Sequence, residues 1–354
     1  MLRNIQALRA LAALMVVVVH LETLAAPLGI GAGQLAPFAV GVDLFFVISG
    51  FIMVHTTARR RQSPAAFLAN RLLRIAPLYW TLTALLFALA LAAPGLLGAT
   101  RADPVALLKS LAFIPGERAD GTMRPVLFVG WSLNLEMAFY CVFALCLTVA
   151  DLRRVLLGVA VLVAIAAFGF AARQHLAPEL RFLTQPILLE FAAGMALGYR
   201  YQAHPGDPRR ARAALALMPL AFLALIAAAT LPEPLARALP VPPALAPAAW
   251  LVWLALRAEA GGRVLAARPV QALGDASYAL YLSHPFVTQG FAFLAAALGL
   301  IHAGTAPALM IACVALAALV GLAVHRGLEL PLTHLARRLC TPATRTRAAP
   351  AGAE

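Results

Sequence analysis

The stretch Arg9-Ala-Leu-Ala-Ala-Leu-Met-Val-Val-Val-Val-His20 decides how this chain folds, because it places a cation and an imidazole in one apolar helix. Eleven helical steps separate Arg9 from His20, which puts their side chains within about 20° of one another and about 16 Å apart along the axis. Ionisable side chains inside a membrane helix are costly and mark functional sites. We therefore expect both residues to face one polar site.

The composition indicates a membrane protein. The 354-residue chain is 62% hydrophobic and 12% charged, whereas a soluble domain carries about 25% charged residues. We expect an all-α, polytopic membrane domain over residues 1–340, with about ten transmembrane helices around a central polar cavity, and a disordered cytoplasmic tail at 341–354. The predicted spans cover residues 7–26, 38–57, 76–98, 129–150, 155–172, 184–200, 214–231, 241–256, 272–294 and 306–325.

The distribution of charge predicts an orientation in the membrane. The net charge of +13 could suggest nucleic-acid binding, but the basic residues sit in short segments between apolar runs. With the N-terminus in the cytoplasm, 21 of the 28 Lys and Arg residues fall on the cytoplasmic side. This positive-inside bias predicts that both termini are cytoplasmic and argues against a nucleic-acid partner. The basic residues left outside are Arg101, Lys109, Arg118, Arg124, Arg173, Arg181 and Arg237.

Several polar residues converge in depth once this orientation is set. His20, Asp43 and Glu136 all fall in the outer third of the membrane, and His284 falls near its midplane. Three ionisable groups in one layer indicate a cavity that water can reach. A carboxylate, from Glu136 or Asp43, could orient the His20 ring and stabilise its protonated form. The pattern leaves open whether Glu190 joins this layer.

The cytoplasmic ends of the first and third predicted helices are basic. Arg9, Arg71 and Arg74 lie there, and the i,i+3 spacing of the last two lets their side chains share one target. A forked guanidinium suits phosphate. The sequence therefore predicts a phosphate-binding inner rim and acid–base chemistry toward the outside.

Each of these residues also has a structural interpretation. Arg71 and Arg74 could be ordinary positive-inside residues, and Asp43 could cap a helix. Glu136 could be a structural partner of a basic side chain, and His20 and His284 could be packing residues. The four cysteines, at 141, 146, 313 and 340, have neither zinc-site nor disulfide spacing, so no metal is expected.

Six segments along nearly the whole chain form a specific pattern together. The segments are IQALRALAALMVVVVH at 5–20, GVDLFFVISGFIM at 41–53, NRLLRIAPLYW at 70–80, WSLNLEMAFY at 131–140, SYALYLSHP at 277–285 and ELP at 329–331. They resemble, in the same order, the acyltransferase-3 family of integral-membrane O-acyltransferases, which includes O-antigen and Nod-factor acetylases. The spelling of the first two is most similar to the exopolysaccharide acetylase branch.

The resemblance implies transfer of an acyl group, commonly acetyl, from cytoplasmic acyl-CoA to a carbohydrate hydroxyl in a bacterial inner membrane. It implies that acyl-CoA is a co-substrate, that no cofactor is bound permanently, and that the acceptor is a polysaccharide or glycolipid. We predict His20 as the general base, Glu136 or Asp43 as its partner, and a phosphate site at Arg9, Arg71 and Arg74. The residues predicted to line the cavity or bind substrate are Trp131, Ser132, Tyr140, Tyr281 and His284.

Two positions depart from the family's pattern. Met137 stands where many relatives have a second acidic or polar residue, which argues against an essential acid there. Ser283 stands where many have Trp, a change that could alter the shape of the pocket.

Two other classes of function compete with this interpretation. A transporter or flippase with a polar path would explain intramembrane His and Glu equally well, but not the arginines placed one pantetheine length from His20. A regulatory or scaffolding membrane protein would leave the polar layer dispensable.

Overall fold

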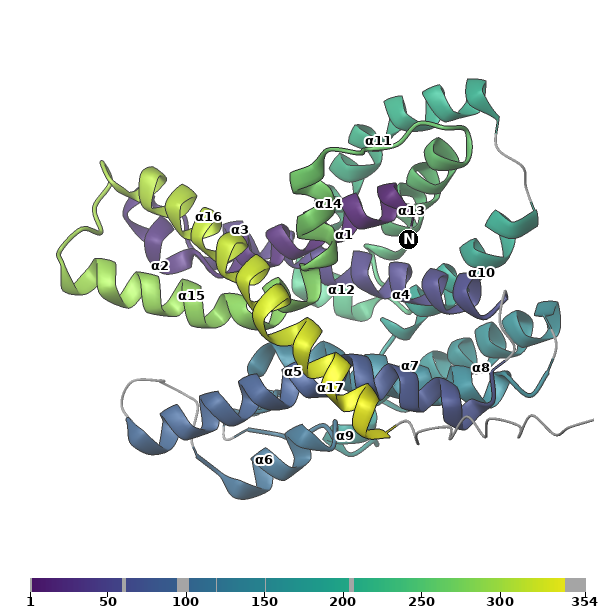
Figure 1. Ribbon diagram of the computed structural model, residues 1–354, viewed down its shortest axis with the longest axis horizontal. Helices are drawn as coiled ribbons and strands as arrows, with labels where there is room; N and C mark the ends of the chain where they lie inside the picture. Colours follow the sequence, from purple (N-terminus) through teal and green to yellow (C-terminus); the bar gives the residue numbers. More distant parts are fainter. Residues whose placement is uncertain are drawn as a thin grey trace, which may run out of the picture.

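The computed structural model describes residues 2–58, 62–93, 102–118, 120–149, 151–203 and 207–340. These residues form helices without a β-strand (Figure 1), so the predicted all-α class is confirmed for this part of the chain. The predicted tail at 341–354 lies outside the described residues. The first half contains α1 (Arg3–Val19), α2 (Glu22–Ala25), α3 (Ala32–Leu35), α4 (Gly41–Thr57), α5 (Pro64–Ala92), α6 (Pro104–Leu111), α7 (Trp131–Cys146) and α8 (Asp151–Ala172).

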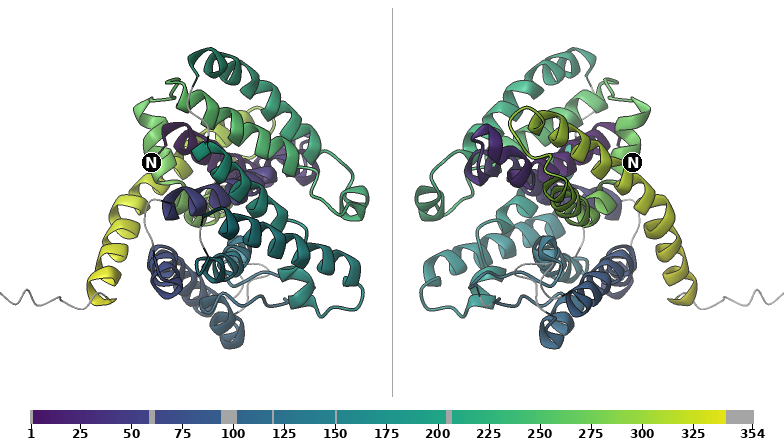
Figure 2. Two further views of the ribbon diagram at one scale, coloured as in Figure 1. Left: turned by 90° about the vertical axis from the view of Figure 1, so that its right-hand side faces the viewer. Right: turned by 90° about the vertical axis from the view of Figure 1, so that its left-hand side faces the viewer.

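The second half continues the helical architecture and ends in a helix that runs obliquely along the outside of the bundle (Figure 2). A π-helical segment, His325–Glu329, connects this last helix to the one before it. The helices are α9 (Pro178–Leu183), α10 (Leu188–Ala203), α11 (Pro208–Ala229), α12 (Glu233–Ala238), α13 (Leu245–Ala260), α14 (Arg268–Asp275), α15 (Ser277–Ala297), α16 (Ala306–Val324) and α17 (Leu330–Cys340).

The helices show a polytopic membrane protein. Within the described residues, seven helical stretches are long and apolar enough to cross a membrane, and the bent pair Arg3–Val19 and Glu22–Leu28 makes an eighth if it counts as one span. All ten predicted segments overlap a helix, but α13 has only 16 residues. The number of ten spans and the placement of the termini stay predictions.

Three boundaries differ from those predicted. The first predicted helix is bent by 60°, because α1 ends at Val19 and His20 leaves helical geometry as its C-cap. The third begins at Pro64 rather than 76, since Ser63 accepts a hydrogen bond from the backbone N–H of Ala66 at 3.2 Å and caps the helix about three turns before its apolar part begins. The predicted segment 272–294 divides at Ala276 into α14 and α15.

Helix α1 lies inside the bundle, where it packs on α4, α13, α14 and α15 (Figure 1). Two glycines permit this close packing. A Cβ at Gly41 would lie 2.4 Å from the carbonyl oxygen of Ala12, and one at Gly274 would lie 2.3 Å from that of Gln6. Larger residues would push these helices off α1.

The start of α1 is held by a residue from the far end of α13. The carboxylate of Glu259 accepts hydrogen bonds from the backbone N–H groups of Arg3 at 2.6 Å and Asn4 at 2.9 Å. The first N–H groups of a helix have no partner within the helix, and they favour a negative charge. The Asn4 side chain also bonds the carbonyl oxygens of Ala255 and Arg263. These contacts fix the end of α1 from which Arg9 projects.

Candidate active site

A polar cavity of about 280 Å³ lies between α1, α4, α5, α7 and α15. It brings together side chains that are more than 250 residues apart in the sequence, from Arg9 to Tyr281. The three predicted phosphate-binding arginines all line it, as do Glu136, Ser132, Tyr140 and Tyr281. The polar and ionisable lining residues are Arg9, Ser49, Thr56, Arg71, Arg74, Ser132, Glu136, Tyr140, Ser277, Tyr278 and Tyr281.

Glu136 is the carboxylate of this cavity. It accepts hydrogen bonds from the hydroxyls of Ser49 at 3.0 Å and of Tyr140 one helical turn further along α7. These bonds hold the carboxylate in one place. In the described part of the chain, no hydrogen bond joins Glu136 to His20, so the predicted contact between them is not formed.

The arginines flank Glu136. Arg71 packs its guanidinium over the ring of Phe67, 5.3 Å from the centroid, and its buried Nε has no hydrogen-bond partner among the described residues. Arg9 is only 7% exposed and donates from Nη1 to the Gln6 side chain at 3.0 Å. The buried Nε–H of Arg71 is therefore a donor available for an anionic or carbonyl ligand.

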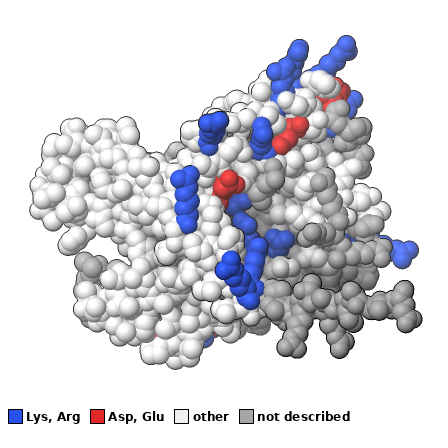
Figure 3. Space-filling view, viewed as in Figure 1, with Lys and Arg blue, Asp and Glu red and all other residues white. Residues whose placement is uncertain are grey.

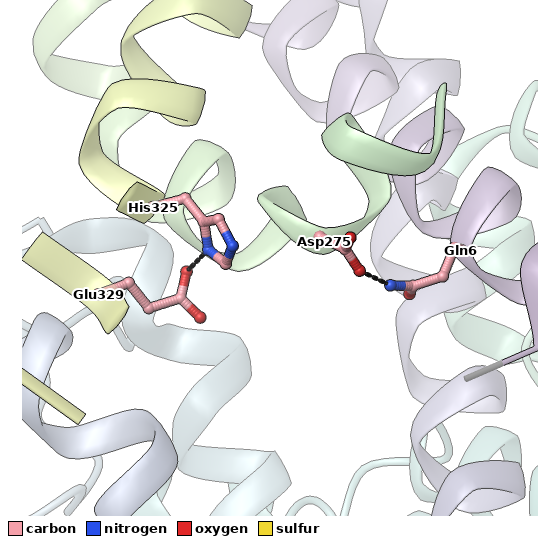
Figure 4. Close-up of polar contacts among 4 residues, drawn as sticks. All are labelled: Gln6, Asp275, His325 and Glu329. Atoms are coloured by element: carbon pink, nitrogen blue, oxygen red, sulfur yellow. Dashed lines mark hydrogen bonds and ion pairs between the residues drawn. The ribbon is translucent and has the colours of Figure 1, made fainter. Parts of the chain in front are cut away.

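A second cavity, of about 310 Å³, adjoins the first at Arg9 and Arg74, which line both. We call it the mouth cavity. Two acidic side chains in it already have partners (Figure 4). Asp275 accepts a hydrogen bond from Gln6, and Glu329 contacts His325 Nδ1 at 2.7 Å. The residues that line the mouth cavity are Gln6, Arg9, Arg74, Asp275, His325, Glu329, Leu330, Thr333, His334 and Arg337.

The mouth cavity is cationic overall. Arg9, Arg74 and Arg337 face two carboxylates that are each bonded elsewhere. The π-helical turn between α16 and α17 supplies His325 and Glu329, and such turns are frequent at functional sites. On the face shown in Figure 3, Lys and Arg form a band beside a broad surface without charge. This arrangement suits a ligand that carries several phosphates.

The other end of the first cavity is closed by a hydrogen-bonded pair. The Tyr281 hydroxyl donates to the carbonyl oxygen of Val129 at 2.8 Å and lies 2.8 Å from the Ser132 hydroxyl. The Ser132 hydroxyl also lies 3.3 Å from the same carbonyl oxygen, so either hydroxyl can donate in the bond between them. Ser132 and Tyr281 therefore join α7 to α15 at this end.

His284 and His20 lie beyond this end. The ring of His284 is 6.1 Å from that of Tyr281 and 5.0 Å from that of His20, measured between centroids. His20 also stacks on Phe128 at 5.2 Å with an interplanar angle of 12°. His20 is half-buried, and its buried Nδ1 has no hydrogen-bond partner among the described residues. The structure thus places the predicted base against a second histidine.

The contacts of His284 fix its tautomer. The fully buried ring has Nδ1 at 2.8 Å from the carbonyl oxygen of Tyr281, which can only accept. Nδ1 therefore carries a proton, and Nε2 of the neutral ring has a lone pair. No described residue bonds Nε2. It is a buried proton acceptor beside His20.

Asp43 lies against another carboxyl rather than against His20. The carboxyl of Glu190, from α10, is fully buried beside it, and neither of the Glu190 oxygens has a hydrogen-bond donor among the described residues. Two ionised carboxylates have no proton to donate, so this contact is a hydrogen bond only when one of them holds a proton. Glu190, whose place the sequence left open, is thus part of the α4–α10 packing.

Sequence reasoning missed much of the mouth cavity. Gln6 could have been found from its i,i+3 spacing to Arg9, and His334 from its spacing to Arg337. The sequence around Asp275 does not indicate that it belongs to this cavity, because only the fold brings it to Gln6. Trp131, predicted at the site, contacts Phe46 and Phe182 edge to face at 6.3 and 6.5 Å and supports the α7 wall.

Comparisons with known proteins agree with this geometry. Residues 2–326 match the acyltransferase-3 family, described as an acyltransferase domain. The chain is similar to the exopolysaccharide production protein ExoZ of Rhizobium meliloti (strain 1021), with 38% identity over 300 residues that cover 84% of this chain and 90% of ExoZ.

It is also similar to the protein named "Putative membrane-bound transacylase BcsY" of Komagataeibacter xylinus, with 30% identity over 301 residues that cover 80% of this chain and 72% of BcsY. No solved structure gives a significant match. Because the family match extends over nearly the whole length and includes every residue of the cavity that holds Glu136, the chain belongs to the acyltransferase-3 family.

Proposed function

We propose that this protein transfers an acyl group, in the simplest case acetyl, from cytoplasmic acyl-CoA to a hydroxyl of a polysaccharide across a bacterial inner membrane. Membership of an acyltransferase family supports acyl transfer. The names of the two relatives, which refer to exopolysaccharide production and to a membrane-bound transacylase, support a polysaccharide acceptor.

The observation that carries the proposal is the pair of adjoining cavities that share Arg9 and Arg74. The mouth cavity would hold the phosphates of CoA on Arg9, Arg74 and Arg337. Arg71 would add its unpartnered Nε where the pantetheine arm enters the inner cavity. That arm extends about 20 Å by its bond count, and the rise from Arg9 to His20 is about 16 Å. The donor would thus reach the level of the two histidines.

The chemistry proposed for His20 is general-base catalysis. Its imidazole takes the proton of the acceptor hydroxyl while the oxygen attacks the thioester carbonyl carbon. A carbon–oxygen bond forms, the carbon–sulfur bond breaks, and the sulfur leaves with the electron pair. The imidazolium then returns the proton to sulfur, which gives free CoA and the ester. An imidazole suits both steps, because it can accept a proton and give it back near neutral pH.

We assign to His284 the positioning role for which the sequence suggested Glu136 or Asp43, because its ring contacts His20. Glu136, held by Ser49 and Tyr140, would act within the cavity and offset the charge of the arginines. Tyr281 and Ser132 would have to move apart for the thioester to pass, since they close the cavity end that faces the histidines.

The experiment is acyl transfer by the purified protein in nanodiscs, with labelled acetyl-CoA and a mixture of bacterial exopolysaccharide fragments. We expect labelled fragments and stoichiometric release of CoA. Absence of acetyl-CoA binding, measured directly by calorimetry, would contradict the proposal and leave a transporter as the better explanation. Binding and transfer without any change on replacing His20 would contradict the assigned base alone.

A further inference from the structure

A third hollow in the molecule, of about 870 Å³, lies where the end of α8, α9, α12 and the segment before α7 meet. We call it the outer groove, because the charge distribution predicts that these segments face away from the cytoplasm. Its volume is within the range of about 300–1,000 Å³ that small-molecule sites occupy. Neither the arginine cavities nor the histidine pair uses its residues.

The outer groove is lined by three arginines and one carboxylate. Arg173, Arg181 and Arg237 face it, and Glu117 is the acidic lining residue in the described part of the groove. Arg237 has a carboxylate of its own, because it forms an i,i+4 pair with Glu233. No described ion pair involves Arg173 or Arg181. The groove therefore keeps a positive charge at these two exposed side chains.

One of the two arginines lies over an aromatic ring, and a second ring lines the same groove. The Arg173 guanidinium lies over the ring of Phe170, 4.5 Å from its centroid, and Phe182 follows Arg181 directly in α9. Phe170 and Phe182 are half-buried, and both line the groove. An aromatic ring packs against the apolar C–H face of a sugar, while a guanidinium forks onto a carboxylate. The combination suits a saccharide that carries an acid.

The position of the groove also connects it to the candidate active site. Phe182 contacts Trp131 edge to face at 6.5 Å, and the next residue, Ser132, lines the inner cavity. On the other side, Met123 lines the groove next to Arg124, whose guanidinium is 6.0 Å from the Phe128 ring that stacks on His20. Trp131 thus lies between a chain seated in the groove and Ser132, and Arg124 and Phe128 lie between that chain and His20.

The predicted orientation gives a second reason to expect a ligand here. Arginine is disfavoured in outer segments, and three of the seven outer Lys and Arg residues line this one groove. An acid on the acceptor would explain their concentration. Anionic lipid headgroups are the competing ligand, but they would not need the half-buried rings of Phe170 and Phe182 in the same groove.

We propose that the outer groove binds the acceptor, and that the acceptor is an acidic saccharide whose carboxylate is held by Arg173 and Arg181. This inference rests on the proposed acyl transfer to a polysaccharide and narrows its substrate class.

The test measures binding and transfer separately, on the full-length protein in nanodiscs. The probes are a glucose tetrasaccharide and the matched tetrasaccharide with one glucuronate. Calorimetry at low salt should show tighter binding of the acidic probe. The double variant Arg173→Gln/Arg181→Gln should weaken it about five- to tenfold, with no change for the neutral probe or for acetyl-CoA. Arg153→Gln, at the other end of α8, is the matched control and should have no effect.

The outcomes separate the two proposals. Equal binding of both probes, or an equal loss for both in the double variant, would overturn the acidic-acceptor inference while leaving acyl transfer intact. An effect of the double variant that appears only when the nanodiscs contain phosphatidylglycerol would assign the arginines to lipid instead. If the unaltered protein does not bind acetyl-CoA, the proposed function is contradicted, whatever affinity the tetrasaccharides show.

Discussion

The imidazole rings of His20 and His284 meet edge to face, 5.0 Å apart between centroids, and each ring has a buried nitrogen to which no described residue forms a hydrogen bond. One ring ends α1 and the other lies in the middle of α15. Two titratable rings brought together from distant helices at the end of a cationic cavity form the centre of the proposed mechanism.

Replacing His20 tests the proposed base. We expect His20→Ala to lower the rate of acetyl transfer about 10²- to 10⁴-fold, because loss of a general base has that effect. Calorimetric binding of acetyl-CoA should be unchanged, since Arg9 lies about 16 Å from His20 along the axis of α1 and the other arginines come from α5 and α17. The control is His302→Ala, an exposed histidine between α15 and α16. Near-normal transfer by the His20 variant would rule out the role.

Two substitutions separate the functions of His284. His284→Asn keeps an N–H near Nδ1 for the Tyr281 carbonyl but removes Nε2, whereas His284→Leu removes both. We expect the Asn variant to fold with an unchanged thermal midpoint and to lose at least about tenfold in kcat, with KM for acetyl-CoA retained. If His284 only packs, the Asn variant should keep full kcat.

The shared arginines can be tested through the KM for the donor. Arg74→Gln and Arg337→Gln each remove a charged donor from the mouth cavity. Each should raise the KM for acetyl-CoA about tenfold or more, because a hydrogen bond to a charged group contributes about 1.5–3 kcal/mol. Arg338→Gln, one residue further along α17 and not in the cavity lining, is the control. Initial rates at varied concentrations of acetyl-CoA would measure the KM of each variant. An unchanged KM in both cavity variants would show that the mouth cavity is not part of the donor site.

The Asp43–Glu190 contact predicts an unusual tolerance. Glu190→Gln supplies an amide donor to Asp43 where the native pair needs a bound proton, so we expect stability equal to or above that of the native chain near neutral pH. Glu190→Ala should instead lower the free energy of unfolding by about 1–3 kcal/mol, because Asp43 loses the fully buried Glu190 carboxyl beside it. Thermal unfolding in detergent measures both. Equal destabilisation by Gln and Ala would show that the two carboxyls do not share a proton.

The cap on α1 gives a prediction for stability. Glu259→Ala removes the acceptor for the N–H groups of Arg3 and Asn4 and should lower the free energy of unfolding by about 1–2 kcal/mol. Glu233→Ala, which breaks an exposed pair, should change it by less than about 1 kcal/mol. Denaturation in a mild detergent compares them, and equal midpoints for the two variants would contradict the capping role.

The sequence predicted the parts of this molecule that depend on local composition. The apolar segments gave the helical class, and the spacing of Arg9, Arg71 and Arg74 placed three arginines that do meet in one cavity. The prediction from sequence failed where a contact between distant segments decides which partner a side chain has. Nothing near Glu136 indicates that Ser49 will bond it, and nothing near Asp43 selects Glu190.

The same limit explains the boundary errors. Hydropathy marks the apolar part of a helix, so it placed the start of α5 inside the helix and missed the Ser63 cap. It also continued α1 through His20, where the chain turns because the imidazole packs on Phe128 and His284 rather than following the helix. In both places, polar or aromatic contacts overrode the apolar pattern.

The Glu259 cap also sets an order for biosynthesis. The helix that carries Arg9 leaves the ribosome well before α13, which supplies the carboxylate that completes its amino end. Until α13 has been translated and inserted, the backbone donors of Arg3 and Asn4 must be satisfied by water or lipid headgroups at the membrane surface. A helix from the interior of the finished protein is thus locked in place only by a segment made more than 200 residues later.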